Sequence, residues 1–470
     1  MLQNNSFRHL FWSSVDNFLQ QILNFVVGII LARILVPEDF GLIGIATFFI
    51  TVTNVLVEGG FGAALINKKN TTQTDYSTIF FINICFSVFL YLLLYISSAG
   101  IASFFSNPSI KPLLQLLGLN IVLVSFELIH RTILIKELAF RKIAVVSLIS
   151  VTISAVCAIV MAKKGWGVYS LVYRVLIGEA ITVVLFWILN KWRPSCLFSW
   201  QSFKQLFLYG GNLLFSNLLN ILQTNIYYVF IGKFFSASAL GYYTRAVTFR
   251  DLFSSNISTI VKKVSFSTLS KEENLKAKRD KFFFFEKVTF LLVSFVSCVL
   301  FFASKEIIII ILSEKWTESI PILQILSLSG VFIVLYNLNI DYFAVLGDTN
   351  QYLRIELIGK LLIIPVLLIA YCGSFQWVLY GIVIHSVIMF LWVSFSLDKV
   401  LKGILKHQLW NLLKVAFIFV GLLLIAYFTR AIEFHNLYFS FVLKCLVIGS
   451  LFAVFYAKEV KQIMYKNKEL

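Results

Sequence analysis

The sequence predicts an all-α, polytopic membrane protein with about 14 transmembrane helices, and three observations lead to this prediction. Of the 470 residues, 59% are hydrophobic and 13% are charged, whereas a soluble domain is about half apolar and about a quarter charged. Apolar runs of about 20 residues recur along the whole chain, and each is long enough to cross a bilayer. Part of the first half is repeated in the second half, which is the usual construction of a secondary transporter.

The predicted transmembrane segments follow one another with short polar connections. In chain order they are 15–35, 41–64, 79–101, 113–131, 143–162, 166–189, 206–232, 239–261, 283–303, 318–345, 353–372, 376–397, 411–429 and 437–457. The first, seventh and eighth segments are only weakly apolar because they carry many polar side chains. The residues before the first segment show no A-x-A-like cleavage site, so we expect no cleavable signal peptide.

Lysine and arginine indicate the orientation of these helices, because cytoplasmic loops carry the excess of positive charge. With the N-terminus placed inside, the inner loops and tails hold 25 Lys and Arg residues and the outer loops hold seven. Both termini are therefore predicted to be cytoplasmic, in a multi-pass protein. The net charge of +17 follows from this topology, so we do not interpret it as the basic surface of a nucleic-acid-binding protein.

The repeat is clearest where two predicted helices meet in a tight turn. The stretch LARILVPEDFGLIGIATFF at 31–49 aligns with IGKFFSASALGYYTRAVTF at 231–249. In this alignment Arg33 corresponds to Lys233, and Gly41 corresponds to Gly241. Because basic, apolar and glycine positions agree together, an internal repeat is favoured over a chance likeness of two helical pairs.

Polar side chains follow one face of the first and of the seventh predicted helix, which are repeat mates. Spacings of three and four residues place side chains on the same helical face. In the first helix these residues are Asn17, Gln20, Gln21 and Asn24, and in the seventh they are Asn212, Ser216, Asn220 and Gln223. A polar group in hydrocarbon is costly, so the two faces are expected to line one polar cavity. Hydrogen bonding between helices, without a cavity, is the alternative.

Basic residues inside the predicted helices are the candidate anion-binding groups. A guanidinium stays charged and can bind phosphate oxygens through two parallel hydrogen bonds, which would suit a phosphate-bearing ligand. The alternative is that each arginine pairs with a nearby carboxylate, such as Arg250 with Asp251 or Arg174 with Glu179. The candidate substrate-binding residues are Arg245, Arg250, Arg174, Asn24, Asn212, Asn220, Gln223 and Lys360.

Carboxylates within or at the ends of the predicted helices are candidates for binding a coupling cation. They are Glu58, Glu127, Glu179 and Asp251. The sequence contains no P-loop, no H-E-x-x-H and no G-x-S-x-G motif. Its six cysteines are isolated, with no C-x-x-C and no Cys/His cluster. We therefore expect no catalytic residues, no cofactor and no metal site.

Several stretches resemble the Wzx/WzxC-type polysaccharide flippases of the multidrug/oligosaccharidyl-lipid/polysaccharide exporter superfamily. They include the first copy of the repeat, EGGFGAALINKKNTTQTDYSTIFFIN at 58–83, GWGVYSLVYR at 165–174 and LSEKWTESIPILQIL at 312–326. The resemblance covers roughly the first 330 residues. The family often has Asp-Leu-Gly-Leu-Gly where this chain has Glu58-Gly59-Gly60-Phe61-Gly62, so the carboxylate is kept on a longer side chain.

The resemblance implies two pseudo-symmetric six-helix lobes around a central, typically cationic cavity, plus two C-terminal helices. The lobes would be 1–190 and 206–397, joined by an inner linker at 191–205 and followed by 398–470. Members of the family move undecaprenyl-diphosphate-linked oligosaccharides from the cytoplasmic to the periplasmic leaflet of the bacterial inner membrane, for lipopolysaccharide, capsule or exopolysaccharide synthesis. Expected partners are this lipid-linked oligosaccharide, membrane lipids and other polysaccharide-assembly proteins, but no nucleic acid.

Three other functions are compatible with a polytopic membrane protein. A drug/cation antiporter of the same superfamily should rely on one or two buried carboxylates rather than on several arginines. A membrane polymerase or ligase of lipid-linked sugars usually needs a large outer loop with catalytic residues, and every predicted outer loop is short. A scaffold without transport activity would not explain the paired polar faces. Lipid-linked oligosaccharide transport by alternating access is therefore the function we expect.

Overall fold

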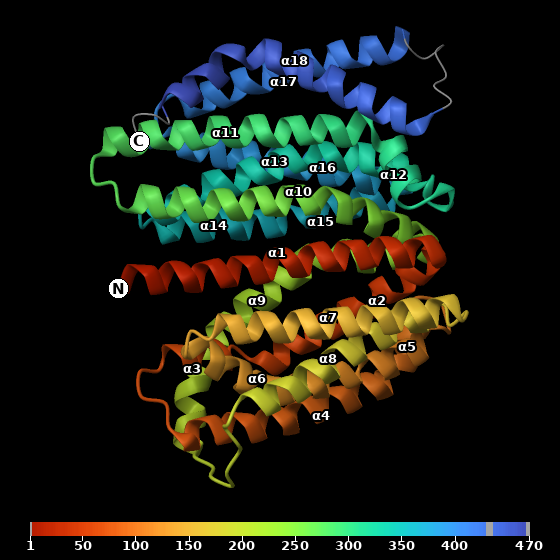
Figure 1. Ribbon diagram of the computed structural model, residues 1–470, viewed down its shortest axis with the longest axis vertical. Coiled ribbons are helices and arrows are strands. Elements are labelled where there is room, and N and C mark those ends of the chain that lie inside the picture. The colour runs from red at the N-terminus through yellow and green to blue at the C-terminus, as the bar shows by residue number, and fades with distance from the viewer. Residues whose placement is uncertain (1, 429–435, 467–470) are drawn as a thin grey trace. The chain divides into compact units, whose positions relative to one another are not determined.

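The computed structural model describes residues 2–428 and 436–466, except for the side chains of 2–17, 212, 349, 426, 428 and 458–466. The chain is helical throughout this part and contains no β-strand there (Figure 1). Its contacts divide the chain into two compact units, Met1–Gly241 and Tyr242–Leu470. The predicted all-α fold is confirmed.

The first unit contains nine complete helices among its described residues. They are α1 (Leu2–Ile34), α2 (Pro37–Glu58), α3 (Phe61–Asn67), α4 (Gln73–Phe104), α5 (Ile110–Leu117), α6 (Leu119–Lys136), α7 (Phe140–Lys163), α8 (Tyr169–Leu189) and α9 (Trp200–Phe234). Gly59 and Gly60, both with positive φ, separate α2 from α3. Glycine adopts this backbone conformation without a steric penalty, which explains the break at this point.

The second unit begins inside a helix. The first turn of α10 (Ala237–Ser270) belongs to the first unit and the rest to the second. The Tyr242 ring packs edge-on against Trp316 at 6.0 Å, and the Tyr242 carbonyl accepts a hydrogen bond from Ser319. The other helices are α11 (Leu275–Phe302), α12 (Ser304–Ile311), the 3-10 turn η1 (Glu314–Trp316), α13 (Ser319–Val345), α14 (Thr349–Leu361), α15 (Ile363–Tyr371), α16 (Phe375–Asp398), α17 (Ile404–Phe428) and α18 (Leu437–Lys466).

Each of the 14 predicted segments falls on a helix or on a pair of consecutive helices. Ten spans within the described residues are long and apolar enough to cross a membrane, with α2–α3 and α5–α6 counted as one span each. The α-helices outside this set are α1, α9, α10, α12, α14 and α15. Of these, α1, α9 and α10 hold the weakly apolar segments seen in the sequence. The protein is a multi-pass membrane protein, and the number of 14 spans stays a prediction.

The polar stretch at 262–282 is mostly helical. Helix α10 continues to Ser270 and α11 begins at Leu275, so only four residues connect them. The Asn274 side chain accepts hydrogen bonds from the backbone N–H groups of Lys276 and Ala277. This N-cap gives hydrogen-bond acceptors to backbone N–H groups that have no partner within the helix.

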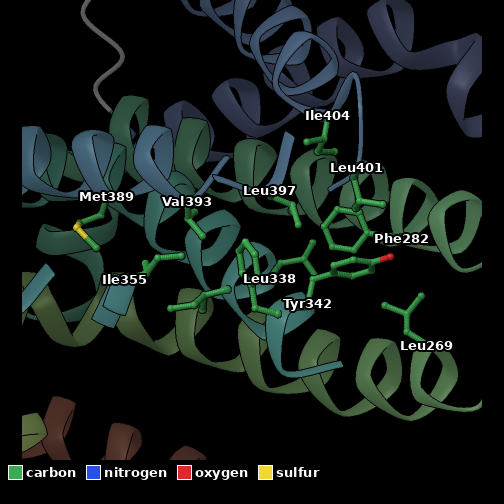
Figure 2. Packing of buried hydrophobic residues seen from close by; sticks show 12 residues of the cluster. Leu269, Phe282, Leu338, Tyr342, Ile355, Met389, Val393, Leu397, Leu401 and Ile404 are labelled. Atoms are coloured by element: carbon green, nitrogen blue, oxygen red, sulfur yellow. The ribbon is translucent and has the colours of Figure 1, made fainter. Parts of the chain in front are cut away.

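Two kinds of packing hold the second unit together. Figure 2 shows a buried apolar cluster from α10, α11, α13, α14, α16 and the start of α17, in which the Phe282 and Tyr342 rings lie 4.6 Å apart. Helices α11 and α13 also pack against each other and both carry buried serines, and the Ser297 hydroxyl donates a hydrogen bond to the Ser327 carbonyl between them. Small residues let helix backbones approach closely, which increases van der Waals contact where lipid removes the hydrophobic driving force.

Candidate functional site

Arg174 and Asn24 form the main polar contact between predicted site residues of the first unit. The Arg174 guanidinium on α8 donates a hydrogen bond to the Asn24 side-chain oxygen on α1 at 2.6 Å. Arg174 is half-buried and Asn24 is exposed. Because Asn24 is neutral, this partner orients the guanidinium without offsetting its positive charge.

The alternative pairing of Arg174 with Glu179 is not formed among the ion pairs of the described residues. Five residues along an α-helix correspond to a rotation of about 140°, so the two side chains leave α8 in different directions. Arg174 meets α1, whereas Glu179 interacts with Glu127 of α6. No ion pair within the described residues therefore offsets the positive charge of Arg174.

The polar face predicted on the seventh helix lies on α9. Asn220 is exposed and Gln223 is half-buried, while the Asn212 side chain lies outside the described residues. The Thr224 hydroxyl donates a hydrogen bond to the Asn220 carbonyl at 2.9 Å, and the Asn225 side chain donates to the Ile221 carbonyl at 3.0 Å. Thr224 and Asn225, two polar residues of α9 beside the predicted face, thus form hydrogen bonds with the backbone of their own helix.

In the second unit, Arg250 on α10 has both an ionic and a neutral partner. Its Nε lies 2.7 Å from an oxygen of Asp251, and its terminal nitrogen donates to the Ser329 hydroxyl at 3.3 Å. The predicted alternative, pairing of Arg250 with Asp251, is therefore confirmed. Arg250 is buried and Arg245 is half-buried. Their spacing of five residues again directs the two side chains differently.

Lys360 also has an acidic neighbour. It lies 3.4 Å from Glu356, one turn earlier on α14. Only 16% of the Lys360 side chain and 27% of the Glu356 side chain are exposed, so this i, i+4 pair is largely shielded from solvent. Lys360 and Arg250 thus differ from Arg174, whose hydrogen-bonding partner is neutral.

Three of the four candidate coupling carboxylates come together in the first unit. Glu58 at the end of α2, Glu127 on α6 and Glu179 on α8 all interact electrostatically with Arg131. We call these three carboxylates and Arg131 the carboxyl cluster. The fourth candidate, Asp251, lies in the second unit beside Arg250. The sequence identified the three carboxylates as candidates, but it indicated neither Arg131 as their partner nor the grouping.

The buried members of the carboxyl cluster have unused hydrogen-bonding capacity. Only 8% of the Glu127 side chain is exposed, and one of its oxygens lies 3.3 Å from Arg131. The second oxygen of Glu127 and one oxygen of Glu179 are buried without a hydrogen-bond partner. No group of three or more His, Cys, Asp or Glu side chains in the described part of the chain is arranged to hold a metal ion.

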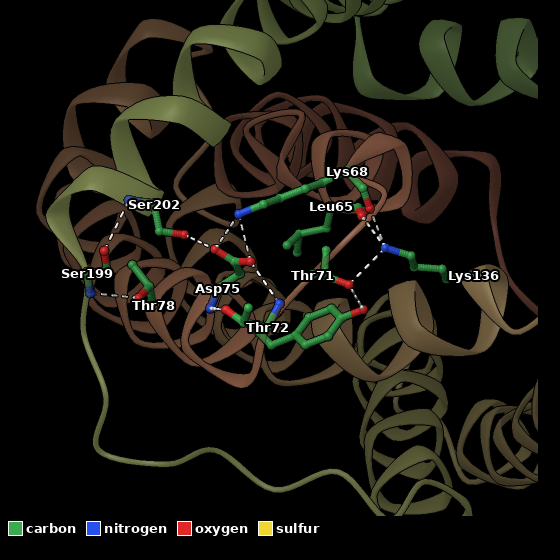
Figure 3. Close-up of polar contacts among 10 residues, drawn as sticks. Leu65, Lys68, Thr71, Thr72, Asp75, Thr78, Lys136, Ser199 and Ser202 are labelled. Carbon is green, nitrogen blue, oxygen red and sulfur yellow. Dashed lines mark hydrogen bonds and ion pairs between the residues drawn. The ribbon is translucent and has the colours of Figure 1, made fainter.

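A second polar network, which the sequence did not predict, joins the end of α3, the start of α4, the end of α6 and the start of α9 (Figure 3). The Lys68 ammonium lies 2.7 Å from Asp75, which also accepts hydrogen bonds from the Thr72 backbone and the Ser202 hydroxyl. Lys136 donates to the carbonyl oxygens of Leu65 and Lys68 and to the Thr71 hydroxyl. The capping pattern Thr72-x-x-Asp75 is the signal that could have indicated the start of α4 and part of this network.

The segment at 191–205 is attached to α4. Trp192 donates its indole N–H to Gln73 at 2.7 Å, and Gln73 donates in turn to the Arg193 carbonyl at 2.7 Å. Further along, the backbone N–H groups of Ser195 and Ser199 donate to the hydroxyls of Ser77 and Thr78, each at 3.0 Å. Hydrogen bonds along its length thus hold this segment on the first unit.

Solved structures with a similar fold are membrane transporters. "Lipid II flippase MurJ, inward closed conformation" matches with a TM-score of 0.76 and 16% identity, covering 96% of this chain and 99% of that chain. An inward-facing multidrug resistance MATE family transporter of the MOP superfamily matches with a TM-score of 0.62 and 15% identity, covering 81% and 95%. At these identities the likeness shows the fold: this is the polytopic fold of MurJ and MATE transporters.

Comparison with related sequences shows the family to which the chain belongs. The family described as "Polysaccharide biosynthesis protein" matches residues 30–321, so the chain belongs to this family. It is 27% identical over 331 residues to the teichuronic acid biosynthesis protein TuaB of Bacillus subtilis (strain 168), covering 70% of this chain and 68% of TuaB. It is 23% identical over 323 residues to the lipopolysaccharide biosynthesis protein WzxC of Escherichia coli (strain K12), covering 68% and 66%. The resemblance seen in the sequence is confirmed.

Proposed function

We propose that this protein moves undecaprenyl-diphosphate-linked oligosaccharide from the cytoplasmic to the periplasmic leaflet of a bacterial inner membrane. Membership of the polysaccharide biosynthesis family and the MurJ-like fold support this function. In this proposal it is a transporter rather than an enzyme, and both termini are cytoplasmic. Its lobes are 1–190 and 206–397, joined by 191–205 and followed by the helices of 398–470.

The contact between Arg174 and Asn24 is the observation that supports binding of the substrate's diphosphate. A half-buried guanidinium oriented by a neutral amide retains a net positive charge. It can therefore exchange or share its hydrogen bonds with phosphate oxygens, which guanidinium groups bind in bidentate geometry. Asn24, Asn220 and Gln223 would supply hydrogen bonds to sugar hydroxyls. In this role they face the substrate in at least one state of the transport cycle.

Transport by alternating access does not require ATP hydrolysis. The sugar head group passes through the protein while the lipid tail stays in the bilayer. An interior-negative membrane potential favours outward movement of negative charge by about 2.3 kcal/mol per charge per 100 mV. A doubly charged diphosphate would gain about twice this amount. The export direction of the proposed substrate is thus the favourable one.

Flipping by the reconstituted full chain tests this function. Proteoliposomes would contain a fluorescent undecaprenyl-diphosphate-linked sugar, and a membrane-impermeant glycosidase would report the fraction in the outer leaflet. Arg174→Gln should reduce the flipping rate about 10-fold or more, corresponding to about 1.4 kcal/mol or more of lost charge-assisted bonding. Arg174→Lys should retain part of the rate, and Arg354→Gln, which changes an exposed arginine, should match wild type.

The same assay separates the proposed function from a drug/cation antiporter. A wild-type protein that does not flip the lipid-linked sugar, yet exports a cationic dye against its gradient, would overturn the flippase proposal. In cells, deletion of the gene should accumulate lipid-linked oligosaccharide on the cytoplasmic side. Re-expression of wild type should clear this pool, and re-expression of Arg174→Gln should not.

A further inference from the structure

A surface groove lies in the second unit, where α16 ends and α17 begins. Its volume is about 430 Å³, which is within the usual range for sites that bind small molecules. Charged residues from both sides of the turn, Asp398 and Lys406, lie along it. The rest of the lining is mostly apolar and comes from one side of α17: Leu405, Leu409, Trp410 and Leu413. The groove thus combines an apolar wall with a charged end.

The turn that carries the groove is held by hydrogen bonds and by apolar packing. The Asp398 carboxylate accepts hydrogen bonds from the backbone N–H groups of Gly403 and Leu405, at 3.0 and 3.1 Å. Arg279 of α11 donates a hydrogen bond to the Lys402 carbonyl at 2.8 Å. The opposite side of the turn is buried in the apolar cluster of Figure 2, through Leu397, Leu401 and Ile404. The groove is therefore part of the packed structure of this unit.

The apolar wall of the groove continues into an exposed apolar face of α17. Both α16 and α17 are long and apolar enough to cross a membrane, so the turn between them lies at a membrane boundary. Beyond Leu413, large apolar side chains follow at spacings of three and four residues, and each is more than half exposed: Phe417, Val420 and Leu424. An acyl chain lying in the groove could thus extend along α17 into the bilayer.

The charged end of the groove is positive. Lys399, Lys402 and Lys406 are exposed, and none of them forms an ion pair within the part of the chain that the structure describes. Together with Asp398 they give residues 398–406 a net charge of +2. These lysines also contribute to the prediction that the turn is cytoplasmic. The cytoplasmic leaflet is the one that carries anionic lipid.

Trp410 lies where a lipid would have its ester groups. It is one helical turn beyond Lys406, and residues four apart are neighbours on a helix surface. Its side chain lines the groove and is 60% exposed. Tryptophan is enriched at membrane boundaries because its ring is apolar and its indole N–H is a hydrogen-bond donor. A phosphate bound by Lys406 would leave the adjoining ester oxygens within reach of Trp410.

We propose that this groove binds an anionic phospholipid from the leaflet on the predicted cytoplasmic side. The lipid phosphate would pair with Lys406 and Lys402, its ester region would contact Trp410, and one acyl chain would lie along Leu409 and Leu413. Basic clefts beside transmembrane helices recognise anionic lipid head groups in this way. The ligand is a lipid of the membrane itself, so the site does not depend on the proposed transport function.

Native mass spectrometry of the delipidated full chain tests the charge selectivity of the groove. Phosphatidylglycerol should bind at concentrations at which phosphatidylcholine with the same acyl chains does not. Lys402→Gln together with Lys406→Gln should weaken this binding about fivefold for each lysine removed. Lys271→Gln together with Lys305→Gln removes two exposed lysines outside the groove and should match wild type. Equal affinities of the two double variants, or equal binding of the two lipids, would overturn the proposal.

A tryptophan substitution distinguishes the groove from a merely basic surface. Trp410→Ala leaves the charge unchanged and should weaken phosphatidylglycerol binding several-fold. Trp377→Ala is the matched control, because Trp377 is also about half exposed (53%) but lies outside the groove. Equal binding by these two variants would show that surface charge alone attracts the lipid, and would overturn the groove as its site.

Competition measurements identify the occupant. Inorganic phosphate at millimolar concentration should not displace phosphatidylglycerol, and displacement would overturn the lipid assignment in favour of a free-phosphate site. Tighter binding of undecaprenyl phosphate, lost in Trp410→Ala, would assign the groove to the lipid carrier instead and would also overturn the proposal. A dimer of the delipidated chain that Trp410→Ala abolishes would make the groove an interface between two copies, with the same consequence.

Discussion

Gly41 of α2 and Gly241 of α10 make reciprocal backbone contacts. A Cβ atom at Gly41 would lie 1.7 Å from the Ala237 carbonyl oxygen, and one at Gly241 would lie 1.8 Å from the Pro37 carbonyl oxygen. Pro37 and Ala237 are the first residues of their helices. Each glycine thus faces the first residue of the other helix, and all four residues belong to the first unit. The two copies of the sequence repeat therefore also make equivalent backbone contacts with each other.

Alanine at either glycine should destabilise the protein, because the added methyl group would overlap backbone atoms that cannot move independently. We expect Gly41→Ala and Gly241→Ala each to cost about 1–3 kcal/mol. The measurement is thermal unfolding of the purified protein in detergent. Gly100→Ala is the matched control, since a Cβ there meets nothing within 4 Å, and its stability should equal or slightly exceed wild type. Unchanged stability of both test variants would contradict the contact.

Loss of the Gln73 side chain should release the segment at 191–205. Gln73→Ala removes the acceptor of Trp192 and the donor to the Arg193 carbonyl. A loss of about 1 kcal/mol would raise local opening about fivefold. Limited trypsin digestion should therefore cleave faster after Lys191, the bond after Arg193 being resistant because Pro194 follows it. Gln201→Ala, at an exposed position of α9, should leave the cleavage rate unchanged, and equal rates for both variants would argue against attachment through Gln73.

The two arginines of α10 are predicted to contact the diphosphate or anionic sugars, in addition to the ion pair of Arg250 with Asp251. Arg245→Gln together with Arg250→Gln should abolish export of the lipid-linked oligosaccharide while the protein level in the membrane remains detectable. The measurement is complementation of a deletion strain, with immunoblotting of the membrane fraction. Full export at a normal protein level would eliminate both residues as substrate contacts.

Glu306 of α12 is predicted to anchor α18. Its side chain is 3% exposed, and one oxygen lies 2.6 Å from the Lys444 ammonium and 2.7 Å from the Ser440 hydroxyl. Lys444→Met should destabilise the protein by about 1–3 kcal/mol, because it leaves a buried carboxylate without its counter-charge. Glu306→Gln in the same chain should recover part of the loss in thermal unfolding. A double variant as unstable as the sum of the singles would show that the two residues act independently.

Much of the fold could be predicted from sequence because helix formation in a membrane is a local property. An apolar run of sufficient length must satisfy its backbone internally, and a helix does so. The turns that end α1 and α9 lie at matching positions, as the alignment of Leu31–Phe49 with 231–249 predicts. The weakly apolar α1, α9 and α10 also lie where the sequence predicts helices, and in α1 and α9 the polar residues that lower the hydropathy follow one helical face.

The partners of the polar residues could not be predicted, because each depends on which faces of distant helices meet. Arg174 binds Asn24, 150 residues earlier in the chain, and not Glu179 on its own helix. The three carboxylates of the carboxyl cluster lie on α2, α6 and α8, and only helix packing brings them together. The segment at 191–205 has the composition of a linker, yet its hydrogen bonds to α4 fix it in place.

The sequence by itself therefore determined the helical membrane fold, the internal repeat and the polypeptide family, since apolar length, periodicity and motif spacing are all properties of neighbouring residues. The tertiary structure decided which charges remain uncompensated and which are paired. The physical reason is that ion pairs and hydrogen bonds form over about 3 Å, whereas the residues that form them are separated by up to 150 positions in the chain. Only the packing of helices against one another brings residues so far apart in the chain within hydrogen-bonding distance.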